Sequence, residues 1–280
     1  MNNPLARHFR QPALYLKLTS NGKYWGEGNL NIPVTGELPI LPMTARDEIL
    51  LRTPDALING SSTVEVIQSC CPDIVNAWAM PSVDVDSLLI AIRIASYGQF
   101  MSITAACPHC GEEHDYDIDL QSVLSKRVMP DYETPVQISN SISVKLKPMS
   151  YIHVSESGVI KLEEEKMMQA LADPNVPDEI RKTEYEKHLK KIIQLNLVSL
   201  ANCTESITAD GEEVTDFEFI KEYYFNTGAA VTKKIQDILE KFYSEMKITA
   251  ELAKCNNETC QKEFVVNVDF DYSHFFGKGF

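Results

Sequence analysis

The spacing of apolar and polar residues divides the chain into an extended first part and a mainly helical remainder. In residues 1–42, prolines and glycines recur often enough to interrupt any regular pattern. Leu14, Leu16 and Leu18 alternate with their neighbours, which predicts one short strand before a turn at Asn21-Gly22. We therefore expect residues 1–42 to form an extended N-terminal arm with little core of its own, which docks on the body of the protein or on a neighbour.

Apolar residues recur at helical spacing from residue 43 onward. Thr44 and Asp47 form a capping box that predicts the start of a helix, and the segment 86–97 is apolar on nearly every face. A helix of that kind belongs at the centre of the core, and Gly98 ends it. The remaining predicted helices are at 53–59, 62–69, 161–172, 179–201 and 229–243, and a second capping box occupies Thr215-Asp216-Phe217-Glu218.

Two strand–turn–strand units surround two pairs of cysteines. The first unit covers residues 99–120 and carries the pair Cys107-x2-Cys110, and the second covers residues 246–270 and carries Cys255-x4-Cys260. The sequence MSITA before the first pair resembles MKITA before the second. Two similar half-sites that close on one ion are the economical explanation of this resemblance.

These patterns together predict an α+β protein. Apart from the arm, we expect a single body over residues 43–280, mainly helical with short antiparallel strands, one of them at 135–147. The two β-knuckles at 99–120 and 246–270 form a zinc-ribbon-like site. One metal ion there would fasten the middle of the chain to its C-terminal part.

Four cysteines are the candidate ligands of a structural zinc ion, namely Cys107, Cys110, Cys255 and Cys260. A CxxC turn places two thiolates on one side of a tight loop, and Gly111 lets the backbone turn sharply after the first pair. The spacing of the second pair is at the loose end of the usual range, and Asn256-Asn257 can supply its longer turn. Two pairs complete a tetrahedral site with no open position, so we predict one structural Zn²⁺ per chain.

Other interpretations of the cysteines remain open. A CxxC pair can be a redox dithiol, although that motif normally opens a helix and here a strand follows it. His109 or His114 could replace one cysteine ligand. Thiols can also be buried without a ligand, which we expect for the three remaining cysteines, Cys70, Cys71 and Cys203.

The net charge and the sequence motifs argue against several classes of function. The net charge is −14 and the first knuckle has acidic flanks, which opposes contact with a phosphate backbone. No apolar run approaches the roughly 20 residues that span a bilayer, and the N-terminus lacks the apolar core of a signal peptide. The catalytic motifs HExxH, GxSxG and the P-loop are absent, so we predict no enzyme. A zinc-ribbon regulator that binds nucleic acid or a polymerase is the alternative to a protein-binding role.

Runs of charged residues in the predicted helices indicate solvated surface. One is the acidic run Glu163-Glu164-Glu165. In the other, lysines at 182, 187, 190 and 191 are interleaved with glutamates, a pattern typical of an exposed helix face with ion pairs at helical spacing.

Several segments carry a resemblance to a known family: NPLARHFRQP at 3–12, LPMTARDE at 41–48, TPDAL at 53–57, CPHCG at 107–111 and EVTDFEFI at 213–220. With these segments the chain resembles the baseplate hub and hub-assembly proteins of T-even-type contractile-tailed bacteriophages (myoviruses). The resemblance implies binding to other baseplate or tail proteins without enzymatic activity, either as a permanent virion subunit or as an assembly chaperone. The long arm and the complete four-cysteine set depart from the shorter members of that family.

The two ends of the chain hold the candidate partner-binding residues: Arg7, Phe9, Arg10, Tyr272, Phe275, Phe276 and Phe280. The basic N-terminal segment suits an acidic partner surface, and the aromatic C-terminal segment suits a buried contact. We expect the partners to be other phage baseplate or tail proteins, including further copies in an oligomer, and neither nucleic acid nor a membrane. The expected location is the host cytoplasm during assembly and then the tail baseplate of the virion.

Overall fold

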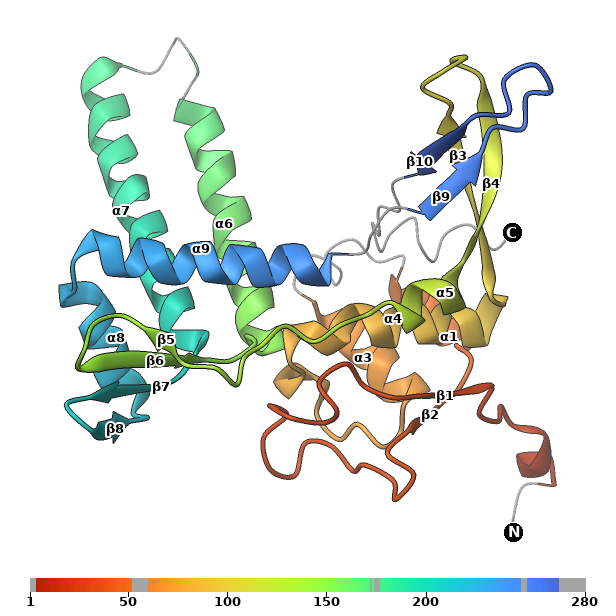
Figure 1. Cartoon of the computed structure of the whole chain (residues 1–280), viewed down its shortest axis with the longest axis horizontal. Coiled ribbons are helices and arrows are strands. Elements are labelled where there is room, and N and C mark those ends of the chain that lie inside the picture. The colour runs from red at the N-terminus through yellow and green to blue at the C-terminus, as the bar shows by residue number, and fades with distance from the viewer. Residues whose placement is uncertain (1–3, 52–59, 172, 174–176, 248–250, 267–280) are drawn as a thin grey trace.

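The computed structural model describes residues 4–51, 60–171, 173, 177–247 and 251–266, and it combines helices with short antiparallel strands (Figure 1). The helices are η1 Ala6–His8, α1 Ala45–Leu51, α3 Ser61–Cys70, η2 Ala77–Ala79, α4 Ser82–Tyr97, α5 Leu120–Ser125, α6 Tyr151–Leu171, α7 Asp178–Asn202, α8 Phe217–Asn226 and α9 Ala229–Met246. The strands are β1 Leu14–Leu16, β2 Leu38–Ile40, β3 Phe100–Ala106, β4 Glu113–Asp119, β5 Val136–Gln137, β6 Ile142–Leu146, β7 Thr204–Ala209, β8 Glu212–Val214, β9 Glu251–Lys254 and β10 Glu263–Val266. The predicted α+β class is confirmed.

The N-terminal segment lies against the helical body and contributes to its core. Strands β1 and β2 pair antiparallel, with Leu14 opposite Ile40 and Leu16 opposite Leu38. Leu16, Leu38 and Ile40 are buried in the same cluster as apolar residues of α3 and α4. The described part of this segment therefore docks on its own chain, and its alternating leucines supply the buried face of β1.

Helix α4 lies at the centre of this first core, where its apolar sequence predicts it. Leu88 and Ile90 are almost completely buried. Asp84, in the first turn of α4, is also completely buried, and it accepts hydrogen bonds from the backbone N–H of Ser20 at 2.8 Å and from Nε1 of Trp25 at 2.9 Å. A buried carboxylate requires such partners, so these bonds attach the N-terminal segment to α4.

A second core lies at the other end of the molecule, where the sheet β5-β6-β7-β8 meets α8, α9 and the base of α7 (Figure 1). Val144 of β6 is opposite Ile207 of β7, and both are buried. Ile220 and Tyr224 from α8 and Ile235 from α9 belong to the same cluster. All strand pairs of this sheet are antiparallel, as we predicted for the short strands of this protein.

The strand predicted at 135–147 is wrong as a single element, because the chain there forms two short strands, β5 and β6. The backbone N–H groups of Ile138 and Ser139 both donate to the carbonyl oxygen of Ile142 and close a tight turn. The polar residues 139–141 at this turn interrupt the alternation on which the prediction depended.

Helices α6 and α7 form a long hairpin that projects from the body (Figure 1). Helix α6 starts at Tyr151, well before the predicted start at residue 161, and the backbone N–H of Tyr151 donates to the carbonyl oxygen of Met80 at 2.7 Å. The helices predicted at 62–69, 179–201 and 229–243 correspond to α3, α7 and α9. The one predicted at 53–59 lies outside the described residues.

The structure confirms one of the two predicted capping boxes and changes the N-cap residue of the other. At α1 the backbone N–H of Thr44 donates to Oδ2 of Asp47 at 2.7 Å, and the N–H of Asp47 donates to Oγ1 of Thr44 at 3.3 Å. At α8 the N-cap is Asp216 instead of Thr215, because the Asp216 carboxylate accepts from the N–H of Phe219 at 3.1 Å. Among the described residues, no helix combines the length and apolar character that a membrane crossing requires.

Candidate metal centre

Four sulfur atoms from two separate hairpins meet at one point. The Sγ atoms of Cys107, Cys110, Cys255 and Cys260 all lie within 4.8 Å of one another. The Sγ–Sγ distance is 4.0 Å between Cys107 and Cys260 and 3.6 Å between Cys110 and Cys255. A tetrahedron of zinc–sulfur bonds of about 2.3 Å has sulfur–sulfur edges of about 3.8 Å, and the two distances of 3.6 and 4.0 Å are close to that value, so the cluster could hold a metal ion.

The first hairpin, β3–β4, positions its cysteines through backbone hydrogen bonds. The N–H of Cys107 donates to the carbonyl oxygen of Glu112 at 2.9 Å, and the N–H of Gly111 donates to the carbonyl oxygen of Cys107 at 2.8 Å. Gly111 has φ +77°, a left-handed conformation that glycine adopts without steric cost. Glycine at this position therefore lets the CxxC turn form without backbone strain.

The second hairpin, β9–β10, makes a longer turn with related hydrogen bonds. The N–H of Cys255 donates to the carbonyl oxygen of Lys262 at 2.9 Å, and the N–H of Cys260 donates to that of Asn257 at 3.1 Å. Gln261 follows the second cysteine with φ +47°, in the place that Gly111 occupies in the first turn. The backbone of the two turns is thus similar although their lengths differ.

Contacts outside the cysteines also hold the two hairpins together. The rings of Tyr116 in β4 and Phe264 in β10 pack edge to face, with centroids 5.3 Å apart. Nδ2 of Asn256 donates to the backbone oxygen of Asp115 at 3.3 Å. Tyr116, Phe264 and Val266 are buried in the first core, so the C-terminal hairpin is attached to the body by apolar packing as well as by the cysteine cluster.

The electrostatics of the cluster favour a bound cation. Burial opposes ionisation of Cys107, but the backbone N–H groups of His109 and Cys110 and the neighbouring thiols lower its pKa to about 7. Although a backbone hydrogen bond from Glu112 favours the Cys110 thiolate, desolvation and the other sulfur atoms raise the pKa of Cys110 to about 12. One thiolate therefore suppresses ionisation of the next, and a divalent cation that binds all of them removes this conflict.

This geometry gives less support to a redox dithiol or to a histidine ligand in the cysteine cluster. Cys107 and Cys110 lie in a turn between two strands, whereas a thioredoxin-like dithiol opens a helix. His109 is exposed, and Nε2 of His114 lies 3.3 Å from a carboxylate oxygen of Glu112. Among the described residues, the group that could hold a metal ion contains the four cysteines and neither histidine.

The other three cysteines are buried thiols. Burial raises the pKa of Cys70 and of Cys71 to about 12, and that of Cys203 to about 11. A thiol with so high a pKa is neutral and unreactive near neutral pH. Packing is therefore the role that this geometry supports for these residues.

The N-terminal partner-binding candidates have different surroundings. Arg10 is engaged within the chain, where its guanidinium donates to the carbonyl oxygens of Ser69 at 2.7 Å and Pro42 at 2.8 Å. Arg7 and Phe9 are exposed, so their side chains are accessible to a partner. The C-terminal candidates lie outside the described residues: Tyr272, Phe275, Phe276 and Phe280.

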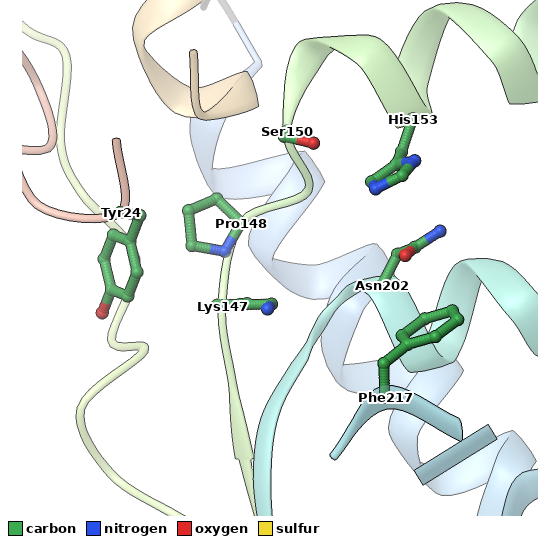
Figure 2. Close-up of a pocket in the computed structure, with 7 residues that line it drawn as sticks. All are labelled: Tyr24, Lys147, Pro148, Ser150, His153, Asn202 and Phe217. Atoms are coloured by element: carbon green, nitrogen blue, oxygen red, sulfur yellow. The ribbon is translucent and has the colours of Figure 1, made fainter. Parts of the chain in front are cut away.

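A recess of about 390 Å³ lies where the two cores meet, and its lining comes from segments far apart in the sequence. Figure 2 shows the side chains that line it, namely Tyr24, Lys147, Pro148, Ser150, His153, Asn202 and Phe217. Nδ1 of His153 lies 3.3 Å from Glu156, and among the described residues no hydrogen bond joins Ser150 to His153. Among the described residues, Ser150 and His153 therefore do not form a serine–histidine pair in this recess.

Glu164, which the sequence predicted to be solvated surface, is buried between α6 and α7 together with His188. Glu164 is 2% exposed and His188 is 7% exposed. Glu164 accepts hydrogen bonds from Nδ1 of His188 and from Nζ of Lys191. The prediction for Glu164 is wrong, because its charged neighbours in the sequence carry no information about which side of α6 meets α7.

Comparison with known proteins gives one match. No curated protein and no solved structure is significantly similar to this chain. The family model described as T4 bacteriophage base plate protein matches residues 29–277, which include both hairpins and all four clustered cysteines. Because the match covers most of the chain, this protein belongs to the T4 bacteriophage base plate protein family.

Proposed function

We propose that this protein is a structural or assembly subunit of the central hub of a contractile-tail baseplate, and that it acts by binding other tail proteins. Membership of the baseplate family over residues 29–277 is the observation that carries this proposal. The family suggests a structural protein, in agreement with the absence of catalytic motifs from the sequence. The virion tail is the corresponding location, reached from the host cytoplasm where the baseplate is assembled.

A structural zinc ion is the second part of the proposal. Four clustered sulfur atoms, all within 4.8 Å of one another, supply the ligand set of a closed Cys₄ zinc site and support this proposal. Such an ion joins cysteines up to 153 positions apart in the sequence, so binding it contributes free energy to folding. Its role is to hold β9–β10 against β3–β4, and no open coordination position remains for catalysis.

The alternative is a zinc-ribbon regulator that binds nucleic acid or a polymerase. The first knuckle carries exposed carboxylates of Glu112, Glu113, Asp115 and Asp117, which repel phosphate groups. This charge distribution favours a protein partner.

Two measurements test the proposal. Elemental analysis of the purified chain is expected to give one zinc per molecule, and a metal-free preparation whose thiols all react freely would refute the zinc site. Mass spectrometry of purified virions and of baseplate assembly intermediates tests the hub role. Presence in both identifies a permanent subunit, presence only in intermediates identifies an assembly factor, and absence from both would overturn the proposal.

A further inference from the structure

The recess where the two cores meet contains a cationic side chain but no carboxylate. Its lining includes Lys147 and His153, and neither an aspartate nor a glutamate is among the residues that line it. Its volume of about 390 Å³ is within the usual range of about 300 to 1,000 Å³ for sites that take small molecules. A concave site with charge of one sign concentrates ions of the opposite sign, so this recess favours an anionic group.

Lys147 is not neutralised by its own chain. The neighbouring Lys145 pairs with Glu205 at 3.1 Å, and Lys23 pairs with Glu133 at 2.5 Å. Lys147, in contrast, has no ion-pair partner in the part of the chain that the structure describes. An anionic group in the recess therefore gains a positive charge without breaking an existing ion pair.

Two carboxylates that do not line the recess contact residues that do. Glu156 lies 3.3 Å from Nδ1 of His153, and Glu133 lies 3.5 Å from the hydroxyl oxygen of Tyr24. Glu133 is already paired with Lys23. Neither carboxylate lies within ion-pair distance of the lysine in the recess, which therefore keeps its charge for a ligand.

Neutral hydrogen-bonding groups accompany the lysine. The hydroxyl of Ser150 and the side-chain amide of Asn202 have no hydrogen-bond partner among the described residues, and both residues are half-buried. Figure 2 shows Lys147 and Asn202 on opposite sides of the same space, with Ser150 between them at the top of the view. These three side chains can therefore donate to one anionic group.

The recess also has an apolar wall, to which Pro148 and Phe217 contribute. Phe217 begins α8, is 39% exposed and belongs to neither core. An exposed aromatic ring close to a cation suits a ligand in which an apolar side chain adjoins the anionic group.

The number of charges distinguishes among possible anions. Nucleic acids carry a phosphate at every nucleotide, and proteins that bind them neutralise several phosphates with clustered lysine and arginine side chains. Arginine is the residue best suited to a phosphate group, because its fork of donors binds two oxygen atoms. This recess offers one unpaired lysine and neutral donors, which match the single charge of a carboxylate.

We propose that this recess binds an aspartate or glutamate side chain of another tail protein, with the carboxylate at Lys147 and an adjoining apolar side chain on Phe217. The inference rests on the proposed protein-binding function and specifies the chemistry of one partner segment. The lining residues come from the N-terminal segment, the connection between β6 and α6, and helices α6, α7 and α8. A partner seated there contacts elements of both halves of the molecule.

The test is a titration of the full-length zinc-bound protein with capped dipeptides, followed by NMR of the ¹⁵N-labelled chain. The acidic probe is acetyl-phenylalanyl-glutamyl-amide, and its neutral counterpart carries glutamine in place of glutamate. We expect the acidic peptide to bind with a dissociation constant of about 1 mM or less, at least about tenfold more tightly than the neutral one. Equal binding of the two peptides, or no binding of the acidic one at about 10 mM, overturns the proposal.

Substitutions separate the charge from the apolar contact. Lys147→Gln should weaken binding of the acidic peptide at least about tenfold and leave the neutral peptide unchanged. Phe217→Ala should weaken both peptides to a similar extent, because it removes a contact that does not depend on charge. The matched control is Lys233→Gln, which removes the charge of an exposed lysine in α9 and should bind like the wild type. If this control loses as much affinity as Lys147→Gln, the effect is one of net charge and the proposal fails.

Charge reversal provides the decisive measurement. Lys147→Glu should lose the acidic peptide and bind acetyl-phenylalanyl-lysyl-amide at least about tenfold more tightly than the wild type does. A variant with unchanged melting temperature and zinc content that shows no such reversal overturns the proposal. Inorganic phosphate that binds more tightly than the acidic peptide, and is lost in Lys147→Gln, overturns it in favour of a small anion. Zinc content and virion composition are measured separately, so failure here leaves the proposed function standing.

Discussion

Nε1 of Trp25 donates a hydrogen bond of 2.9 Å to Oδ2 of Asp84, and this bond joins the N-terminal segment to the central helix α4. Both residues are buried, and Asp84 also accepts from the backbone N–H of Ser20. Burial raises the pKa of Asp84, whose carboxylate is stabilised by these donors in place of water. This side chain of the helical body therefore helps to hold the N-terminal segment in place.

Replacing this carboxylate should destabilise the fold. In Asp84→Ala, the donors of Ser20 and Trp25 lose their acceptor inside the core, and we expect a loss of about 3 kcal/mol in the free energy of unfolding. Urea denaturation followed by tryptophan fluorescence measures it. Glu65→Ala on the exposed face of α3 is the control, with an expected change within about 0.5 kcal/mol. Equal stability of the two variants would contradict the role given to Asp84.

Cysteine substitutions should divide the thiols into two groups. Cys107→Ser and Cys255→Ser remove a thiolate ligand, so each should lower the zinc content from one per chain to nearly none and lower the melting temperature. Cys203→Ala removes a buried thiol of the second core and should keep its zinc while losing some packing energy. Elemental analysis and calorimetry with and without a chelator measure both effects. Zinc retained by the Cys107 and Cys255 variants would refute the assignment.

Two glycines should respond oppositely to alanine. Gly111 has φ +77°, so Gly111→Ala places a side chain in the left-handed region and should cost about 1 kcal/mol, observed as weaker zinc binding in competition with a chelator. Gly158 lies within α6, and a Cβ there would meet no atom within 4 Å. Gly158→Ala should therefore stabilise the protein by up to about 1 kcal/mol without changing zinc affinity. The same effect from both substitutions would show that the turn does not need its left-handed residue.

The ion pairs of Glu164 should make the α6–α7 hairpin sensitive to acid. Hydrogen bonds from Lys191 and His188 lower the pKa of Glu164 below its ordinary value. Because the folded-state pKa lies below the unfolded one, this contribution is complete above about pH 4.3 and is lost as the pH falls through the lower value. Glu164→Gln should lower the melting temperature near neutral pH and have progressively less effect in acid. Glu165→Gln, at an exposed neighbouring position, is the control, and a Glu164 effect that is independent of pH would exclude this explanation.

Features that depend on neighbours in the sequence were predictable. The Thr44–Asp47 capping box, the central helix α4 and the β3–β4 hairpin with its CxxC turn all follow from spacing and turn residues. The baseplate family was also evident from short segments, since residues 29–277 match its model. Such signals are local because a helix cap or a tight turn is closed by hydrogen bonds within a few residues.

Features that depend on distant segments were not predictable in the same way. The sequence placed Arg10 among the partner-binding residues, whereas the fold turns its guanidinium toward Ser69 and Pro42. Glu164 reads as exposed surface, but it is buried because α7 brings His188 and Lys191 to that side of α6. The side chains of Arg10 and Glu164 can lie in solvent or pair with a buried partner. Only the packing of remote elements decides which of these two arrangements is adopted.

By itself the sequence determined the α+β class, the baseplate family and the two cysteine pairs at the tips of their hairpins. Only the tertiary structure decided that the four sulfur atoms lie within 4.8 Å, that Asp84 bonds to the N-terminal segment, and that Glu164 is buried against His188. The physical reason is the range of the interactions. Backbone hydrogen bonds and side-chain periodicity act within a few residues, whereas burial and charge pairing join segments more than a hundred residues apart.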